Sequence, residues 1–368
     1  MTAPAPLQGV RVVDLSRLLP GAFATLMLAE MGAEVIKIED PAGGDPMRQL
    51  PPILNGRGLY DLLLNRGKKS VVLDLKRDDG LKSLDRLIAT ADVVVESFRP
   101  RTARRFGVSG EQLRARHPRL VHCAITGYGQ TGPYAERPGH DLNYVALSGL
   151  LWAEARTTGE LPRMFMADVG GGAQTAVISM LAAIIARDRH GTGASLDVSM
   201  HDSALYWMMI PAVRDVIDDG ASASGDLPTF GAHASYNVYE TRDGLRLALG
   251  ALERKFWVAF CQAIDRPDLA ARHDTGEADQ ADLIRETRRV FATRTREEWL
   301  DFFGAHDVCL TPLNTPAEAL RDPHARARGL VSHQAGVRAV RPPFLGRAAP
   351  LAPAPALGAN TDEILASL

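Results

Sequence analysis

Cysteine and long apolar runs are both scarce in this sequence of 368 residues. Its cysteines are Cys123, Cys261 and Cys309, and no two of them form a CxxC pair. This pattern argues against a disulfide framework or a zinc site and favours a reducing, cytoplasmic location. The longest apolar run, residues 175–186, is too short to cross a bilayer, so we expect a buried core helix. No signal peptide is expected, because no basic segment precedes an apolar one at the N-terminus.

The sequence also lacks an excess of charge of either sign. Its formal net charge is −2, with 23% charged and 46% hydrophobic residues. These values are typical of a soluble globular enzyme, and they predict neither a nucleic-acid partner nor a membrane partner. A chain of 368 residues is long enough for two domains.

Strand-like and helix-like segments alternate over residues 10–128. The expected strands are rich in β-branched residues and cover 10–15, 34–39, 70–75, 92–98 and 120–128. Helical periodicity marks 21–33 and 78–91 between them. Apolar strands separated by helices predict a parallel sheet covered on both faces, as in a Rossmann-like α/β domain. No GxGxxG motif follows the first strand, so NAD binding is not expected.

The rest of the chain divides into a core segment and a smaller domain. Residues 166–193 are expected to form a strand end, a glycine-rich turn and a buried helix. Residues 236–251 predict a hairpin, and helical patterns follow it at 253–264, 283–293 and 296–306. We therefore predict a Rossmann-like large domain with a parallel sheet over 1–210, completed by 320–368, a linker at 211–231, and a smaller α+β domain over 232–319.

Three places stand out as candidates for chemistry. His140 and Asp141 are adjacent in the turn-forming segment PGHDLNY, Asp168 precedes three glycines, and Glu253 opens a helix. Backbone N–H groups beside Asp168 would bind a developing oxyanion. Each residue also has a structural explanation. His140 would be a hydrogen-bonded turn residue and Asp141 the cap of the next helix. Asp168 would be a cap beside glycines that serve packing, and Glu253 a helix-start residue stabilised by the helix dipole.

Basic residues gather after the expected strands of the first domain. They are Lys37, Arg48, Arg66, Lys68, Lys69, Arg99, Arg101, Arg104 and Arg105. Ligands of open α/β sheets bind at the carboxyl ends of the strands, so this pattern predicts a phosphate-bearing ligand. A solvated basic rim is the alternative.

Read together, these segments resemble the family III CoA-transferase superfamily. The similar stretches follow one another along most of the chain, at 7–41, 65–76, 91–100, 127–144, 166–187, 191–202 and 250–257. The superfamily contains α-methylacyl-CoA racemases as well as CoA-transferases. The segment GHDLNY is similar to the racemase branch, because transferases more often carry tyrosine or another residue in place of His140. Asp168, and Glu253 in GALERKFW, also match the racemase pattern.

The resemblance implies a cofactor-independent racemase or epimerase of 2-methylacyl-CoA thioesters. His140 and Asp168 would exchange the α-proton on opposite faces of the acyl carbon through an enolate, and Glu253 would orient His140. Coenzyme A is then part of the substrate, and no metal or other cofactor is expected. Two alternatives stay open. One is a CoA-transferase in which Asp168 attacks the thioester and forms an aspartyl-acyl anhydride. The other is a CoA-binding scaffold without activity.

The resemblance also implies CoA-binding residues and a dimer. The residues are Leu73, Asp74, Leu75, Lys76, Arg99, Arg105, Gly139, Asp141, Leu142, Asn143 and Tyr144. One position departs from the family, because Asp40 stands where several racemases have an arginine that contacts CoA. We expect Lys37 or Arg48 to compensate, or the nucleotide end to bind differently. The family forms interlocked homodimers, so Glu253 is expected to reach the active site of a partner chain.

Overall fold

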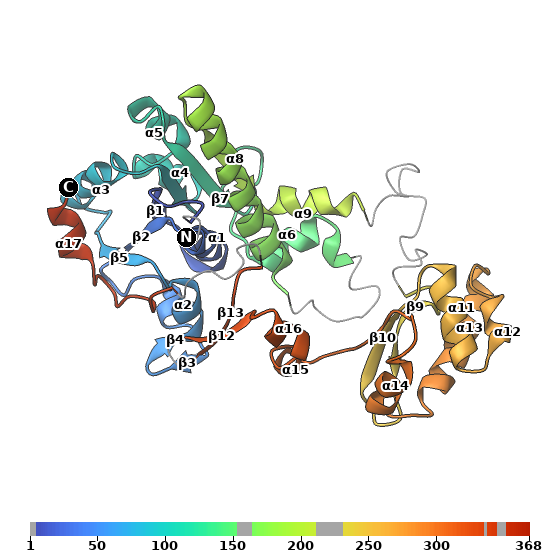
Figure 1. Cartoon of the computed structure of the whole chain (residues 1–368). Helices are drawn as coiled ribbons and strands as arrows, with labels where there is room; N and C mark the ends of the chain where they lie inside the picture. Colours follow the sequence, from blue (N-terminus) through green and yellow to red (C-terminus); the bar gives the residue numbers. More distant parts are fainter. Residues whose placement is uncertain (1–4, 153–163, 211–230, 335–336, 344–350) are drawn as a thin grey trace. The chain divides into compact units, whose positions relative to one another are not determined.

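The computed structural model describes residues 5–152, 164–210, 231–334, 337–343 and 351–368 (Figure 1). The chain divides into two compact units. The first comprises Met1–Leu151, Pro162–Met208 and Ala327–Leu368, and the second comprises Trp152–Leu161 and Met209–Arg326. Residues 320–326 therefore belong to the second unit rather than to the large domain. Apart from its last residue, the predicted linker at 211–231 lies outside the described residues.

Six parallel strands form the sheet of the first unit. They are β1 (Arg11–Leu15), β2 (Glu34–Glu39), β5 (Lys69–Val72), β6 (Val93–Glu96), β7 (Val121–Thr126) and β8 (Ser195–Ser199). Their order in space is β5-β2-β1-β6-β7-β8. This is the order of a doubly wound Rossmann sheet, and it confirms the predicted α/β fold. The direction of strand order reverses between β1 and β6, and such a switch point is where these sheets bind ligands.

Helices cover both faces of this sheet. On one face pack α1 (Leu18–Glu30) and α8 (Thr175–His190), and on the other α3 (Asp78–Ile88), α4 (Pro100–Arg105), α5 (Gly110–Arg116) and α17 (Thr361–Ala366). Successive side chains of a strand point to opposite faces. In β6, Val93 and Val95 are accordingly buried with α1 and α8, and Val94 with the other layer. Burial on both sides explains the continuous apolar runs of these strands.

The helix that follows Phe165 starts earlier than predicted. Residues Met166–Gln174 form a π-helix, η2, which runs directly into α8. The expectation of a strand end and a turn before the helix is therefore wrong. Together, residues Met166–His190 are long and apolar enough to cross a membrane by length and composition alone. The side chains of Ala176, Met180 and Ala183 are nevertheless buried in the core of the first unit.

Short elements complete the first unit. They are η1 (Pro46–Arg48), β3 (Ile53–Leu54), β4 (Arg57–Gly58), α2 (Leu59–Leu64), α6 (Asp141–Leu147), α9 (Met200–Met208), β12 (Val331–Gln334) and β13 (Val337–Val340). Of these, α6 and α9 pack against η2, and the three elements share a small apolar cluster that includes Tyr144, Ala167 and Ala204. This packing brings the loop with His140 to the helix with Asp168.

The second unit has an antiparallel sheet and several helices. Its strands, in the order β11-β10-β9, are β9 (Tyr236–Glu240), β10 (Arg246–Gly250) and β11 (Leu310–Pro312). Its helices are α11 (Arg254–Ala263), α12 (Pro267–Ala270), α13 (Glu277–Phe291), α14 (Arg296–Phe303), α15 (Pro316–Ala319) and α16 (Pro323–Ala327), the last ending at the boundary with the first unit. Stacked aromatic rings, such as Phe260 on Phe291 at 5.6 Å, fill its core. The predicted hairpin is present, with Gly244 at a φ of 74° in its turn.

Candidate active site

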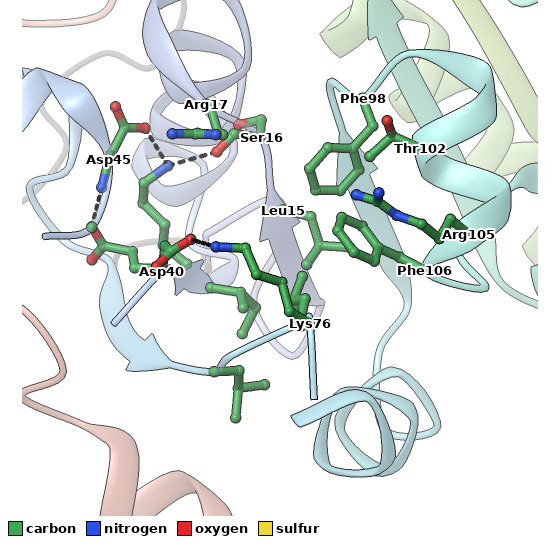
Figure 2. A pocket seen from close by; sticks show the side chains of 16 residues that line it. Leu15, Ser16, Arg17, Asp40, Asp45, Lys76, Phe98, Thr102, Arg105 and Phe106 are labelled. Atoms are coloured by element: carbon green, nitrogen blue, oxygen red, sulfur yellow. Dashed lines mark hydrogen bonds and ion pairs between the residues drawn. The ribbon is translucent and has the colours of Figure 1, made fainter. Parts of the chain in front are cut away.

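A cavity of about 260 Å³ opens at the carboxyl ends of the sheet strands, in the first unit (Figure 2). Its lining comes from the ends of β1, β2 and β5 and from the segment that runs from β6 into α4. The lining residues are Leu15, Ser16, Arg17, Lys37, Ile38, Glu39, Asp40, Gly44, Asp45, Leu73, Leu75, Lys76, Phe98, Thr102, Arg105 and Phe106. The cavity thus lies at the switch point of the strand order.

Four of the predicted CoA-binding residues line this cavity: Leu73, Leu75, Lys76 and Arg105. Lys76 is exposed, and its ammonium group lies 3.6 Å from the carboxylate of Asp40. Asp74 does not line the cavity, but its carboxylate accepts a hydrogen bond of 3.0 Å from the backbone N–H of Lys76. Asp74 therefore shapes the turn that presents Lys76.

The two cations expected to compensate for Asp40 are both engaged inside the protein. Lys37 borders the cavity, but its ammonium group lies 3.1 Å from Asp45 and donates to the carbonyl of Ser16. Arg48 is only 9% exposed and forms an ion pair of 2.6 Å with Glu39. Neither charge is free for a ligand.

Arg17 supplies the extra cation that the sequence analysis missed. It is exposed, it lines the cavity, and its backbone N–H donates to the hydroxyl of Ser97. The signal was its place two residues after the first strand, near the ligand crevice of such sheets. The ring of Phe106 lies under the guanidinium of Arg105 at 4.8 Å and packs edge-on against Phe98. Figure 2 shows these two rings beside Arg105.

His140 occupies the N-cap position of α6, and it is exposed. Its backbone N–H donates to Oδ1 of Asn143 at 3.0 Å, and its carbonyl accepts from the N–H of Asn143 at 2.8 Å. The prediction that Asp141 caps this helix is therefore wrong, since Asp141 is its first helical residue. Asn143, expected to contact CoA, stabilises this helix start, and Leu142 is 46% exposed beside it.

Asp141 binds the backbone of Asp168 directly. The N–H of Asp168 donates to Oδ1 of Asp141 at 2.8 Å, across 27 positions of sequence. Burial, and then the nearby charge of Asp141, raise the pKa of Asp168 to about 7. Burial also raises the pKa of Asp141, while hydrogen bonds from the N–H groups of Asp168 and Ala167 oppose this effect. A carboxyl group with a pKa near 7 both gives and takes protons at neutral pH.

The glycines after Asp168 serve packing, as the structural explanation of this segment predicts. A Cβ on Gly170 would lie 2.1 Å from the ring of Trp207 in α9. A Cβ on Gly172 would lie 3.0 Å from Met200 and 3.1 Å from Pro20. The N-cap of η2 is Phe165, so Asp168 does not cap it. The N–H of Asp168 is already bound to Asp141 and is not free for an oxyanion.

Tyr144 interacts electrostatically with both Asp168 and Arg99. Its ring is buried, and a Cβ on Gly139 would lie 2.6 Å from it, so Gly139 permits this close approach. Burial raises the pKa of Tyr144, the charge of Asp168 adds to this effect, and the charge of Arg99 opposes it. Arg99, the exposed N-cap of α4, thus acts on the same tyrosine as Asp168.

Glu253 lies in the second unit, where it is the exposed N-cap of α11. Its carbonyl accepts from the N–H of Phe256 at 3.0 Å. This position agrees with the structural explanation of Glu253 as a residue that starts a helix. Its contact with His140 remains a prediction. Among the described residues, no group of three or more His, Cys, Asp or Glu side chains is arranged to hold a metal ion.

Comparisons with known proteins give one family and two activities. The model of CoA-transferase family III matches residues 7–361. The chain is 32% identical to alpha-methylacyl-CoA racemase of Mus musculus, over 98% of this chain and 92% of the relative. It is 33% identical to succinate–glutarate CoA-transferase of Agrobacterium fabrum, over 99% and 96%. A CAIB/BAIF family protein from Brucella suis has a similar structure, with a TM-score of 0.85, 29% identity and coverage of 99% and 100%. The chain therefore belongs to CoA-transferase family III.

Proposed function

We propose that this enzyme racemises 2-methylacyl-CoA thioesters by moving the α-proton between His140 and Asp168. The observation that carries the proposal is the state of Asp168: it is half-buried beside a second carboxylate, with a pKa of about 7. An acid–base group works best when its pKa is close to the working pH. A nucleophilic carboxylate, in contrast, needs to be ionised.

The reaction requires two groups on opposite faces of one carbon. One group takes the α-proton, the bonding electrons pass to the thioester carbonyl as an enolate, and the other group returns a proton to the opposite face. His140 is exposed at the start of α6, next to the residue that binds the backbone of Asp168. The contact between α6 and η2 supports a shared role for His140 and Asp168. No metal or redox group takes part in this proposal.

Coenzyme A would occupy the cavity at the strand ends. Lys76, Arg17 and Arg105 would bind its phosphates, because ammonium and guanidinium groups form charge-assisted hydrogen bonds with phosphate. Lys76 would exchange its contact with Asp40 for a phosphate oxygen. The rings of Phe98 and Phe106 offer an apolar wall for the adenine. Arg99 and Tyr144 connect this region to Asp168.

We also propose a homodimer of interlocked chains in the cytoplasm. Apolar side chains are exposed on α8 and α9 of the first unit, including Ile178 at 69% and Tyr206 at 70%. Exposed apolar surface of this kind is typical of subunit interfaces. The partner subunit's Glu253 would then bind His140 and hold the imidazole in place. The three cysteines are free thiols, which supports a reducing compartment.

A CoA-transferase is the second candidate, because a succinate–glutarate CoA-transferase is as similar to this chain as the racemase is. Asp168 would attack the thioester carbon and release CoA thiolate, forming an aspartyl-acyl anhydride. The thiolate would then attack the aspartyl carbonyl, which frees the donor acid and leaves an Asp168–CoA thioester, and the acceptor carboxylate would take over the CoA by the same two steps in reverse. Incubation of one acyl-CoA with and without acceptor acids, followed by hydroxylamine, separates the candidates. A racemase needs no acceptor and yields no Asp168 hydroxamate. CoA transfer that depends on an acceptor, together with such a hydroxamate, would overturn the proposal.

A further inference from the structure

We infer that Asp141 is a positioning residue for the reaction, which anchors the backbone of Asp168 and places a second carboxylate beside its side chain. The inference rests on the proposed function, in which Asp168 transfers protons. It gives Asp141 a role in acid–base chemistry rather than in binding CoA.

The anchoring contact is well defined. The N–H of Asp168 donates to Oδ1 of Asp141 at 2.8 Å, which ties the first turn of α6 to the first turn of η2. Both ends of this contact are fixed by packing. The glycines of η2 lie against α9 and α1, and Tyr144, one turn along α6, is buried. Asp141 therefore holds Asp168 in a fixed place.

The charge of Asp141 stands out among the groups around Asp168. The elements packed against η2 are α1, α6, α8, α9, β7 and β8. Their titratable and charged side chains are Glu30, Asp141, Tyr144, Arg187, Asp188, Arg189, His190, His201, Asp202, Tyr206, His122, Cys123 and Asp197. Within the described part of the chain, Asp141 supplies the charge that shifts the pKa of Asp168, in addition to burial.

The surroundings of the two carboxyl groups push their proton affinities apart. Burial raises the pKa of Asp141 too, but the hydrogen bonds that it accepts from the N–H groups of Asp168 and Ala167 favour its charged form and oppose this rise. Burial and the charge of Asp141 both favour the protonated form of Asp168. Two neighbouring carboxyl groups with unequal surroundings are a known arrangement for acid–base catalysis, because one stays ionised while the other carries the proton.

The test compares Asp141→Asn with Asp141→Ala. Asparagine keeps an oxygen that accepts the N–H of Asp168 but removes the charge, whereas alanine removes both. The matched control is Asp197→Asn, because Asp197 also accepts a backbone N–H, that of Gln130, and also has a pKa raised by burial. The first readout needs no substrate. It is the titration of the Asp168 carboxyl, followed by NMR in protein labelled with ¹³C at aspartate and assigned with Asp168→Asn.

The expected result is a titration of Asp168 near pH 7 in the wild type and in Asp197→Asn, and a lower value, by about one unit, in Asp141→Asn. Burial remains in that variant, so the value stays above 3.8. A folded Asp141→Asn protein in which Asp168 titrates at the wild-type pH overturns the inference. If Asp141→Ala fails to fold, the titration of Asp168 in Asp141→Asn still tests the inference.

The pH profile of α-proton exchange is the second readout. In Asp141→Asn, the limb of the pH–rate profile that reports the ionisation of Asp168 is expected to move to lower pH by the same amount as the NMR titration. A role in structure alone would lower the rate equally at every pH, and that outcome counts against the inference. The racemase proposal and the inference about Asp141 can be refuted independently of each other. A wild-type enzyme without exchange refutes the racemase, whereas an unchanged Asp168 titration refutes only the role of Asp141.

Discussion

Asp168 and Asp141 have the same side chain, but their surroundings differ, and this difference supports the separate roles that we propose for them. Asp141 is the first residue of α6; burial raises its pKa, and the backbone N–H groups of Asp168 and Ala167 oppose this rise by binding its carboxylate. Asp168 is half-buried, and its carboxyl group faces that charge. The difference arises from position alone. It leaves Asp168 able to exchange a proton at neutral pH while Asp141 holds it in place.

Asp168→Asn is expected to stabilise the protein above neutral pH. The pKa of Asp168 is about 7 in the folded state, against 3.8 for an ordinary aspartate. Between these values the folded state binds more protons than the unfolded state, so stability falls as the pH rises, and the full cost is present above pH 7. Asparagine cannot ionise, so the variant avoids this cost, which is on the order of 2 to 4 kcal/mol near pH 8.

Thermal unfolding near pH 5 and near pH 8 measures this effect. The gain in melting temperature of Asp168→Asn should be clearly larger at the higher pH. Asp301→Asn, at an exposed position on α14, is the control and should change little at either pH. An Asp168→Asn variant that gains equally at both values, or loses at both, contradicts the assignment of a raised pKa.

The sequence predicted the strands of the sheet, but it did not predict where the helices η2 and α6 begin. The order of the strands was predictable, because apolar strands and helix periodicity repeat regularly, although the strand predicted at 70–75 already ends at Val72. Arg105 was accordingly placed at the ligand crevice, whereas Lys76 was expected only from the resemblance to the family. The π-helix η2 was not predictable, because its glycines read as a turn until α9 and α1 pack against them. The cap of α6 was also missed, since aspartate is the commoner cap and His140 has no such preference.

Gly170→Ala is expected to destabilise η2 and to displace Asp168. The new Cβ would lie 2.1 Å from the ring of Trp207, and overpacking of this kind costs about 1–3 kcal/mol. Urea unfolding measures the loss. Gly250→Ala is the matched control, because no atom lies closer than 3.9 Å to its Cβ position. Equal effects of the two variants would mean that the packing of η2 does not depend on its glycines.

Lys76→Ala is expected to weaken the binding of coenzyme A about 10-fold or more, the loss of one charge-assisted contact with phosphate. Lys76 is exposed at the cavity, so the fold should not change. Calorimetric titration with coenzyme A measures the affinity. Lys82→Ala, on the exposed face of α3, is the control and should bind as the wild type does. Unchanged affinity in Lys76→Ala would move the nucleotide site away from this cavity.

At the scale of the whole molecule, the proposed dimer explains an apolar surface that a monomer would leave in water. Ile178→Lys places a charge on the exposed face of α8 and is expected to shift the chain from dimer to monomer. Sedimentation velocity measures the change. Arg189→Glu, on an exposed residue near the end of α8, is the control and should remain dimeric. A wild-type chain that sediments as a monomer contradicts the dimer and the role of the partner subunit's Glu253.

Within a family that has two activities, we propose that this protein is a racemase that works through His140 and Asp168. The most direct measurement follows a single epimer of a 2-methylacyl-CoA in D₂O, without any acceptor acid. We expect deuterium to enter the α-position while the opposite epimer accumulates, and we expect His140→Ala and Asp168→Asn each to slow this racemisation by about 100-fold or more. His190→Ala, an exposed histidine at the end of α8, should retain wild-type rates. An epimer that remains unlabelled and unchanged across a panel of acyl groups contradicts the proposed racemase activity.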